Sequence, residues 1–408
     1  MRILWISHFL LYPETGYGAL QRSRNLLIEL CKYHEVSLIC LYRDADKKLA
    51  PNLMLAEKDL KKFCKTVCFI PHNLTTVKRG FFIFKSIVTK LPYSVYIYRS
   101  DMLNKKILQL ALDNTIDLVH SDTIGMLEPI LNNIKAIKVL NHHDIESHKM
   151  LRRSANEEKI INRIFFRHEY KCIYEYEKIY YKNYDLNIVV SDIDQYRMKE
   201  INQNIQATII ENGVDCDYFA FNQREKNSHE LIFIGALDYY PNYKAMLFFC
   251  NTIWPILKGK YPDLKLTIIG KKPPKQLISL IGSSKSIDML GYVDDIRPHV
   301  KRATVFVCPI KEGGGTRIKI LDAMSQGIPV VSTSIGAEGL NIENGNHILI
   351  ADSIPEFVDG ISELIENNEL SNRISLQARE YVEKNYSYKY IGEKLATVYK
   401  GLSERNRD

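Results

Sequence analysis

Short apolar runs and amphipathic helical patterns alternate along most of this 408-residue chain. Continuous runs rich in β-branched and aliphatic residues predict buried strands. These runs are 2–7, 35–42, 66–70, 116–120, 137–141 and 186–190 in the first half, and 231–235, 265–270, 287–290, 304–309, 328–333 and 347–351 in the second. Helical patterns lie between them, including one long helix predicted over 145–182. Such alternation is typical of parallel sheets covered by helices on both faces.

The two sets of predicted strands together are too many for a single sheet of ordinary size. We therefore expect an α/β protein with two doubly wound, Rossmann-like domains that face each other across a cleft. The sequence turns polar near 200–212, which places the first domain at 1–205 and the second at 206–385. Ligands of such sheets bind beyond the carboxyl ends of the strands, so functional residues are expected directly after the predicted strands.

The composition narrows the class of protein further. Hydrophobic residues make up 46% and charged residues 25%, as in an ordinary globular protein, and no apolar run approaches the roughly eighteen residues of a transmembrane helix. Ser7 and His8 interrupt the apolar N-terminal run, and no small-residue cleavage site follows, so the run predicts a buried strand rather than a signal peptide. Eight scattered cysteines without a C-x-x-C pair predict reduced thiols, a cytoplasmic location and no zinc ribbon.

Positive charge is concentrated in residues 60–100, which contain eight Lys or Arg residues and no Asp or Glu, whereas the whole chain has a net charge of +7. Aromatic residues interleave the basic ones in the stretch KRGFFIFKSIVTKLPYSVYIYRS. Such a surface can contact anionic lipid headgroups, peripherally at the inner face of a membrane, or it can receive an anionic acceptor. A solvated face over buried aromatic residues is the alternative. No nucleic-acid-binding motif accompanies the charge, so nucleic acid is not an expected partner.

The segment EGGGTRIKILDAMSQGIPVVS at 312–332 holds the densest candidate chemistry. It opens with Gly313, Gly314 and Gly315. Adjacent glycines are expected where the backbone needs positive φ or approaches a ligand closely. Thr316 is predicted to cap the following helix, whose free N–H groups suit a phosphate. Arg317 and Lys319 add positive charge in the first turn, where the helix dipole disfavours cations unless an anion lies between. A plain connecting loop with solvated basic side chains is the alternative.

Two other segments follow predicted strands and give weaker signals. Gly16 and Gly18 open a helix in a G-x-G-x-x-Q pattern that departs from the dinucleotide fingerprint, so a phosphate or sugar contact is expected there rather than a nicotinamide or flavin site. The strand at 137–141 is followed by HHDIESH, where a histidine can donate a hydrogen bond to a sugar hydroxyl. A structurally satisfied histidine pair and a metal site are the alternatives. No second ligand cluster completes a metal site, so none is predicted.

Five segments in one order resemble the GT-B glycosyltransferases, specifically glycosyltransferase family 4. They are IIENGVDCDYF at 209–219, LIFIGALDYYPN at 231–242, LKLTIIGKKP at 264–273, LGYVDDIRPHVKRATVFVCP at 290–309 and GGGTRIKILDAMSQGIPVVSTSIGAEGL at 313–340. The resemblance covers nearly the whole chain, is strong over 209–340 and is looser in the first half. It also implies that a C-terminal helix within 386–408 packs back on the first domain.

The resemblance implies a retaining transfer of a sugar from a nucleotide-diphosphate sugar to a glycan or lipid-linked acceptor, in bacterial surface polysaccharide biosynthesis and without a cofactor or essential metal. In the family's E-x7-E motif the second Glu contacts the ribose, and Asp322 takes its place here. The first Glu falls on Gly314, and Glu312 can fill its sugar-contacting role only with two inserted residues. His143 and Asp144 match the family's His-Asp pair, so His143, rather than His142, is expected to face the transferred sugar.

The family's basic pair after the first strand of the second domain is missing, because Ala236 follows Gly235 and Asn242 lies where Lys is frequent. Arg317 and Lys319 are the expected replacements at the leaving diphosphate. Gly235 and Gly270, at the ends of predicted strands, are expected to border the donor.

Two other functions remain open at this point. A sugar-nucleotide epimerase on the same fold would need no acceptor, and the basic, aromatic segment would then lack a purpose. A non-catalytic sugar-nucleotide-binding subunit is suggested by the departures at Gly314, Asp322 and Ala236.

Overall fold

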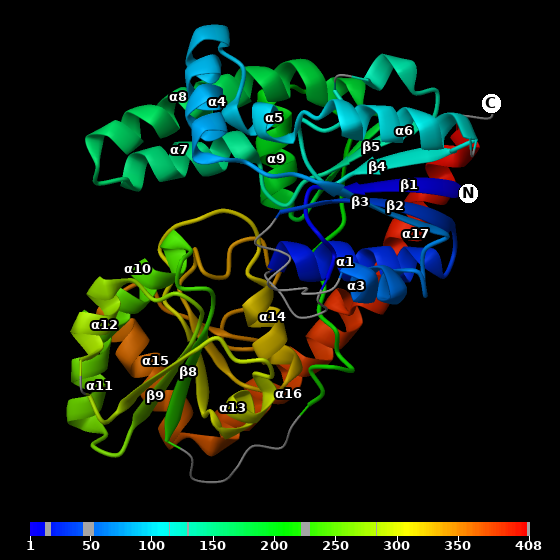
Figure 1. Ribbon diagram of the computed structural model, residues 1–408. Helices are drawn as coiled ribbons and strands as arrows, with labels where there is room; N and C mark the ends of the chain where they lie inside the picture. The colour runs from blue at the N-terminus through cyan, green and yellow to red at the C-terminus, as the bar shows by residue number, and fades with distance from the viewer. Residues whose placement is uncertain are drawn as a thin grey trace. The chain divides into compact units, whose positions relative to one another are not determined.

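The structure of the protein is a computed structural model that describes residues 1–12, 18–43, 53–113, 115–128, 130–221, 229–282 and 284–405 (Figure 1). The chain divides into two compact units. The first unit comprises Met1–Glu211 and the chain from Ile391 onward, and the second unit comprises Asn212–Tyr390. The division lies a few residues beyond the expected boundary at 205, because 207–209 form a strand of the first sheet.

In the described part of the first unit, seven parallel strands form one sheet in the order β3-β2-β1-β4-β5-β6-β7. They are β1 (Arg2–Ser7), β2 (Glu35–Tyr42), β3 (Thr66–Pro71), β4 (Leu118–Ser121), β5 (Ile137–Asn141), β6 (Leu186–Val189) and β7 (Ala207–Ile209). The sequence pattern predicted all of them except β7. This short edge strand has three half-buried residues and no continuous apolar run.

Helices cover both faces of this sheet, with α1 and α3 on one side and α5 and α6 on the other (Figure 1). The helices of the unit are α1 (Gly18–Cys31), α3 (Leu53–Leu60), α4 (Thr76–Thr89), α5 (Tyr93–Tyr98), α6 (Asp101–Asp113), α7 (Glu146–Asn156), α8 (Ile160–Tyr180), α9 (Asp192–Ile201) and α17 (Tyr388–Arg405). Most of α17 belongs to this unit, where Gly392 lies against Glu29 of α1. Aliphatic residues of β1, β4 and β5, such as Leu4, Val119 and Leu140, lie in the buried core beneath these helices.

The single helix predicted over 145–182 is wrong. The backbone of Glu157 and Lys159 is extended, and the segment forms the hairpin of α7 and α8. The turn lets the start of α7 reach the end of α8, where the backbone N–H of Ser147 donates to the carboxylate of Glu177 at 3.1 Å. A continuous helix could not bring these two residues together.

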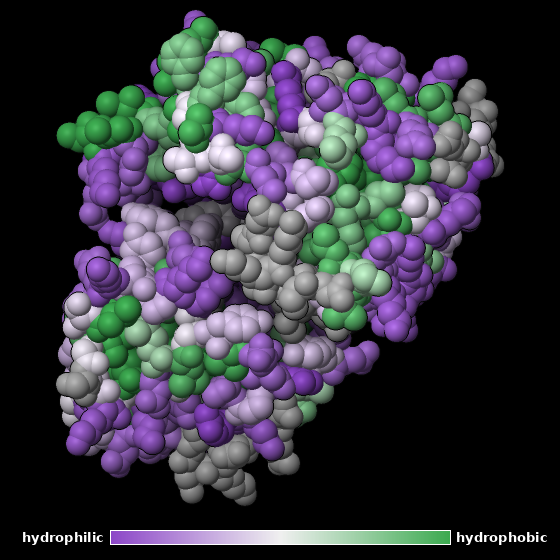
Figure 2. All heavy atoms as spheres, viewed as in Figure 1, coloured by the Kyte–Doolittle hydropathy of each residue, from purple (hydrophilic) through white to green (hydrophobic). Residues whose placement is uncertain are grey.

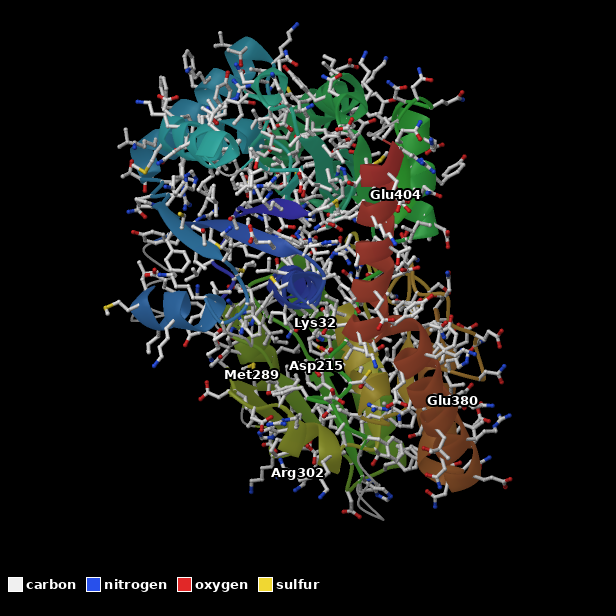
Figure 3. All side chains as sticks on the ribbon, turned by 90° about the vertical axis from the view of Figure 1, so that its right-hand side faces the viewer. Lys32, Asp215, Met289, Arg302, Glu380 and Glu404 are labelled. Atoms are coloured by element: carbon white, nitrogen blue, oxygen red, sulfur yellow. The ribbon has the colours of Figure 1, made fainter. Side chains whose placement is uncertain are left out.

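In the described part of the second unit, six parallel strands form a sheet in the order β10-β9-β8-β11-β12-β13. They are β8 (Glu230–Ile234), β9 (Lys265–Ile269), β10 (Ile287–Gly291), β11 (Val305–Cys308), β12 (Val330–Ser332) and β13 (Leu349–Ile350), all within one or two residues of the predicted runs. The helices are α10 (Tyr240–Phe248), α11 (Trp254–Lys260), α12 (Lys275–Ile281), α13 (Arg297–Arg302), α14 (Ile318–Ser325), α15 (Ile354–Glu366) and α16 (Asn368–Tyr386). In Figure 3 the labelled Glu380 on α16 and Met289 on the edge strand β10 lie at opposite sides of this unit.

Both units are therefore doubly wound, as the alternating pattern predicted. The strand order reverses beside β1 in the first sheet, where β1 pairs with both β2 and β4. It reverses beside β8 in the second sheet, where β8 pairs with β9 and β11. Loops diverge at such a switch point and leave room for a ligand beyond the carboxyl ends of the strands.

Candidate functional site

The switch point of the second sheet is bordered by two glycines that permit close backbone approach. A Cβ on Gly270, after β9, would lie 2.9 Å from Leu237 Cγ and 3.0 Å from the carbonyl carbon of Gly235. A Cβ on Gly235, after β8, would overlap the ammonium of Lys319 and lie 2.8 Å from Asn242 Nδ2. Gly270 thus allows two loops to pack together, and Gly235 leaves the space that a cation occupies.

The loop between β11 and α14 contains the three adjacent glycines. Gly313 and Gly315 have φ values of 113° and 68°, which only glycine adopts readily. Gly314 and the half-buried Glu312 complete this part of the loop. Beyond this loop, the side chain of Lys319 reaches Gly235 at the end of β8.

Thr316 does not cap α14, contrary to the sequence-based prediction. Its hydroxyl oxygen instead accepts a hydrogen bond from the side-chain amide of Asn212, at the start of the second unit. The N-cap of α14 is Arg317, which has an extended backbone and makes no side-chain capping bond. The N–H groups of the first turn are therefore not consumed by a side-chain cap.

Arg317 is buried and folds back over the glycine loop. Its Nη1 donates to the carbonyl oxygens of both Gly314 and Gly315. Its Nη2 lies 3.1 Å from the position of a Cβ on Gly313, and no residue that the structure describes accepts a hydrogen bond from it. One half of the guanidinium thus orders the loop, while the other half keeps its donor capacity for a ligand.

Lys319 reaches the loop that follows β8. Its ammonium donates to Asn242 Oδ1 at 2.7 Å and lies 4.5 Å from the centre of the Phe233 ring. Burial, together with a smaller effect of the Arg317 charge, lowers the pKa of Lys319 to about 8. The ammonium therefore stands beside Asn242, the position where the resemblance led us to expect a lysine, although it comes from a different helix.

Asp322 and Gln326 line a small pocket one turn deeper along α14. The pocket has a volume of about 10 Å³ and is lined by Ile234, Ile296, Val300, Phe306, Lys319, Asp322, Ala323 and Gln326. Asp322 Oδ1 and Gln326 Oε1 are buried, and neither accepts a hydrogen bond from the described residues. Burial raises the pKa of Asp322 to about 8, and the charge of Asp215, labelled in Figure 3, also raises it. Asp322 is half-buried rather than fully exposed, and the charge of Lys319 acts to lower its pKa, so the two side chains interact electrostatically.

Three polar residues follow neighbouring strands at the switch point of the first sheet. His8 follows β1, Asp122 follows β4, and His143 lies just after β5. The rings of His8 and His143 are 6.1 Å apart between centres. His8 Nδ1 and His143 Nε2 are buried, and no described residue partners either atom. Burial lowers the pKa of His143 to about 4 and that of His8 to about 3, so both imidazoles are neutral near pH 7.

The two adjacent histidines have different surroundings. The Nε2 atom of His142 lies 3.0 Å from Asn187 Oδ1, and its ring packs edge-on against Tyr181. His142 is therefore the structurally satisfied member of the pair. His143 is the one whose ring nitrogen is available to a hydroxyl group.

Asp122 is at the centre of a buried network that the sequence pattern did not single out. It accepts hydrogen bonds from Trp5 Nε1 at 3.0 Å and Asn141 Nδ2 at 2.8 Å, and its Oδ1 is 3.2 Å from His120 Nε2. On its other side His120 is hydrogen-bonded to the hydroxyl of Tyr399 in α17. The polar triplet HSD, which ends the apolar strand β4 and continues one residue beyond it, is the signal that could have indicated it.

The remaining sequence-based predictions receive less support from the structure. Gly18 is the first residue of α1, whereas Gly16 lies outside the described residues, so a phosphate contact at this helix stays a prediction. Within the described ranges, no group of three or more His, Cys, Asp or Glu residues is arranged to hold a metal ion. Nor does any described helix combine the length and apolarity needed to cross a bilayer. All eight cysteines are described, and all are free.

Solved structures with this architecture define the class of fold. Sucrose-phosphate synthase from Thermosynechococcus elongatus is 15% identical, with a TM-score of 0.71 over 98% of both chains. Anabaena HepE, solved in complex with UDP-glucose, is 15% identical, with a TM-score of 0.66 over 98% of this chain and 100% of HepE. The chain thus has the GT-B fold of two Rossmann-like units.

The sequence comparisons supply the activity class. Residues 228–367 match the family described as "Glycosyl transferases group 1". An uncharacterized 44.6 kDa protein in the cps region of Klebsiella pneumoniae is 22% identical over 96% of this chain and 97% of its own length. Phosphatidyl-myo-inositol mannosyltransferase of Mycobacterium leprae is 25% identical over 53% of this chain and 59% of its own length. The family match over 228–367 and the fold of the whole chain together support a GT-B glycosyltransferase.

Proposed function

We propose that this glycosyltransferase moves a sugar, with retention of its anomeric configuration, from a nucleotide-diphosphate sugar to a glycan or lipid-linked acceptor. One observation carries the proposal: the ammonium of Lys319 stands at the Gly235 loop beside an Arg317 guanidinium that keeps an unused donor. Two cations beside uncapped helix N–H groups suit a diphosphate. The solved complexes of HepE with UDP and with UDP-glucose favour this class of donor.

The chemistry needs charge stabilisation at the diphosphate. As the bond between the sugar C1 and the phosphate oxygen breaks, its electron pair remains on the diphosphate. The acceptor oxygen forms the new bond to C1, and we propose that its proton passes to a phosphate oxygen of the donor. Arg317 and Lys319 stabilise the developing charge, and no cofactor or essential metal is expected.

Other residues would hold the parts of the donor that do not react. Asp322, one turn deeper on α14, is proposed to accept hydrogen bonds from the ribose hydroxyls. In the first unit, His143 is proposed to contact the transferred sugar. A neutral imidazole can both donate and accept hydrogen bonds with sugar hydroxyls. Glu312 remains the candidate for a second sugar contact.

A thermal-shift screen tests the donor site directly. UDP, UDP-glucose, GDP-mannose and inorganic diphosphate would each be added, because a ligand at about 100 times its Kd adds about 2.7 kcal/mol to the free energy of unfolding. At least one nucleotide diphosphate should stabilise the protein, and Arg317→Gln should lose most of that shift. Lys301→Gln, on the exposed end of α13, is the matched control and should retain it. Equal shifts in the parent and Arg317→Gln would overturn the assignment of this loop.

Turnover separates the transferase from the other functions open to the fold. Nucleotide diphosphate release would be measured with and without acceptor extracts, in the presence of a chelator. Acceptor-dependent release supports the transferase, acceptor-independent sugar isomerisation supports an epimerase, and donor binding without release supports a binding subunit. The anomeric proton coupling of the product, measured by NMR, then tests retention.

The biological setting is proposed on two grounds. The Klebsiella relative lies in a cps region, which supports a role in surface polysaccharide biosynthesis. The free cysteines and a nucleotide-sugar donor support a cytoplasmic location.

A further inference from the structure

Helix α4 has two apolar faces, and only one of them is packed. Ser86 is its one fully buried residue, and Phe82 and Ile83 are half-buried on the same side. Val77, Phe81, Phe84 and Val88 recur at intervals of four, three and four residues, which aligns them on the opposite side of the helix. Their exposed fractions are 83%, 53%, 63% and 63%. Hydrophobic side chains accordingly gather over α4 on the surface shown in Figure 2.

The orientation of α4 is fixed by its inner face. Ser86 Oγ donates a hydrogen bond to Glu169 Oε1 of α8 at 2.9 Å. The Thr89 and Tyr96 hydroxyls are 2.7 Å apart, and Phe82 stacks on the Tyr96 ring. Thr75 caps the start of the helix through the N–H of Lys78. These contacts fix the orientation of α4, so its apolar outer face is held toward the solvent.

A second exposed apolar group lies at the start of α8, in the neighbouring hairpin. Ile160, Ile161 and Ile164 share one side of the helix, and their exposed fractions are 69%, 82% and 65%. The same side continues with three exposed basic residues, Arg163, Arg167 and Lys171. Figure 2 shows hydrophobic side chains at this end of the α7–α8 hairpin as well.

Basic residues also flank the stripe on α4. Lys78 and Lys85 lie along one edge of it, and the Lys85 ammonium is 5.5 Å from the centre of the Phe81 ring. No acidic residue occurs between 60 and 100, while Glu157 and Glu158 lie in the turn that precedes Ile160. Apolar side chains bordered by long basic ones are typical of helices that lie in a membrane interface.

We propose that the apolar stripe of α4, with its basic neighbours, forms a docking surface for an anionic lipid bilayer. The stripe comprises Val77, Phe81, Phe84 and Val88, with Ile87 beside them. The exposed isoleucines of α8 form a separate group, because Ile160 lies on the side of α8 opposite Glu169, which contacts α4. The apolar side chains enter the boundary between headgroups and acyl chains, and the Lys and Arg side chains contact anionic headgroups. A protein partner would need acidic residues placed around an apolar patch to match this surface. An anionic bilayer presents negative headgroups next to apolar acyl chains over its whole surface.

Vesicle flotation of the full chain tests the proposal without any donor or acceptor. Vesicles of phosphatidylcholine alone would be compared with vesicles that contain phosphatidylglycerol. The parent should float with the anionic vesicles and only weakly with the neutral ones. Lys78→Gln with Lys85→Gln should lower the partition coefficient about 25-fold, because each basic residue near the surface contributes about fivefold. Phe81→Gln with Phe84→Gln should lower it at least tenfold.

Matched controls lie on α6 of the same unit. Leu112 has an exposed fraction of 80%, and Lys105 is exposed, so Leu112→Gln and Lys105→Gln remove similar groups from another helix. Both should float like the parent, and circular dichroism would verify that all variants are folded. Raising the salt from about 0.1 M to about 1 M shortens the Debye length from about 10 Å to about 3 Å and should weaken parental binding.

Three outcomes would overturn the proposal. The parent could fail to float with anionic vesicles at low salt, the α4 variants could float like the parent, or the α6 controls could lose binding equally. Self-association that Phe84→Gln abolishes, without vesicle binding, would assign the surface to a second copy of the chain instead. None of these results depends on turnover, so the transferase proposal stands or falls separately.

Discussion

The two units differ in how an aspartate near the carboxyl ends of the strands is hydrogen-bonded. In the first unit, Asp122 is hydrogen-bonded to Trp5, Asn141 and His120. In the second unit, Asp322 Oδ1 has no hydrogen-bond partner among the described residues. Both residues lie at a switch point of a parallel sheet, so the same topology supports a satisfied network in one unit and unsatisfied groups in the other.

The pKa values express the same difference. Burial alone would raise the pKa of Asp122, but the hydrogen bond and charge of His120 and the Asn141 hydrogen bond hold it well below its usual range. At Asp322, burial dominates and raises the pKa to about 8. Groups that the protein satisfies contribute to its stability, whereas groups left unsatisfied are available to a ligand.

The largest effect is expected on stability at Asp122. Asp122→Ala leaves Trp5 and Asn141 with buried donors and no acceptor, and should lower the free energy of unfolding by about 3–5 kcal/mol. Urea unfolding, followed by the fluorescence of Trp5 in the first unit and Trp254 in the second, would measure it. Asp322→Ala should cost little or nothing. Equal losses for the two variants would remove the contrast.

Lys319 should matter for rate rather than for stability. Replacing Lys319 with Met removes a cation from the leaving diphosphate, so the activation free energy should rise by about 2–4 kcal/mol. The values of kcat and kcat/KM should therefore fall together, by tens to a thousandfold. Steady-state kinetics with saturating acceptor would show it, and Lys301→Gln serves as the control. A parental rate in the Lys319 variant would contradict the assigned role.

The two adjacent histidines should separate activity from stability. His143→Ala should lower kcat by raising the activation free energy by about 1–3 kcal/mol, because a neutral hydrogen bond to the sugar is lost. The affinity for the free nucleotide diphosphate should be unchanged. His142→Ala should instead lower the free energy of unfolding by about 1–3 kcal/mol, since Asn187 loses its partner. If a chelator abolished activity and a divalent metal restored it only when both histidines were present, a metal role would replace this assignment.

Donor affinity should depend on pH through Lys319. Burial lowers its pKa to about 8, below the ordinary value of 10.5, so in the donor-free protein the side chain is charged below pH 8 and neutral above it. Diphosphate binding favours the charged form and must add a proton above that pH. Affinity for UDP should therefore be flat below pH 8 and about tenfold weaker near pH 9. Lys319→Arg keeps its charge, and its affinity should not decline; a parallel decline would exclude Lys319 as the titrating group.

The smallest effect is expected for Asp322→Asn. With a pKa of about 8, Asp322 is largely protonated at neutral pH, so the amide is close in shape and charge. Loss of part of the ribose contact should weaken donor binding by about 0.5–1.5 kcal/mol. The donor KM should rise accordingly, with kcat preserved. A 2′,3′-dideoxy donor analogue should bind the parent and the variant equally. Intact donor bound equally by both proteins would remove Asp322 from the ribose site.

The hydrophobic pattern along the chain is enough to predict the periodic features of this protein. Continuous apolar runs predicted every strand but the edge strand β7, and the alternation with helices predicted two doubly wound sheets. Positive φ at Gly313 and Gly315 is likewise a local property of the chain, and it was expected from the glycines alone. Such features follow from the preferences of neighbouring residues, which a one-dimensional pattern records.

The pattern does not reveal which polar groups find hydrogen-bond partners, because those partners come from distant segments of the chain. Thr316 bonds Asn212 instead of its own helix, Lys319 reaches Asn242, and Ser147 reaches Glu177 because the predicted long helix turns back. Asp122 is satisfied by Trp5, a residue 117 positions away in the sequence. Hydrogen bonds and burial depend on contacts between distant segments, so the pattern located the candidate groups, and the fold divided them into structural groups and groups available to a ligand.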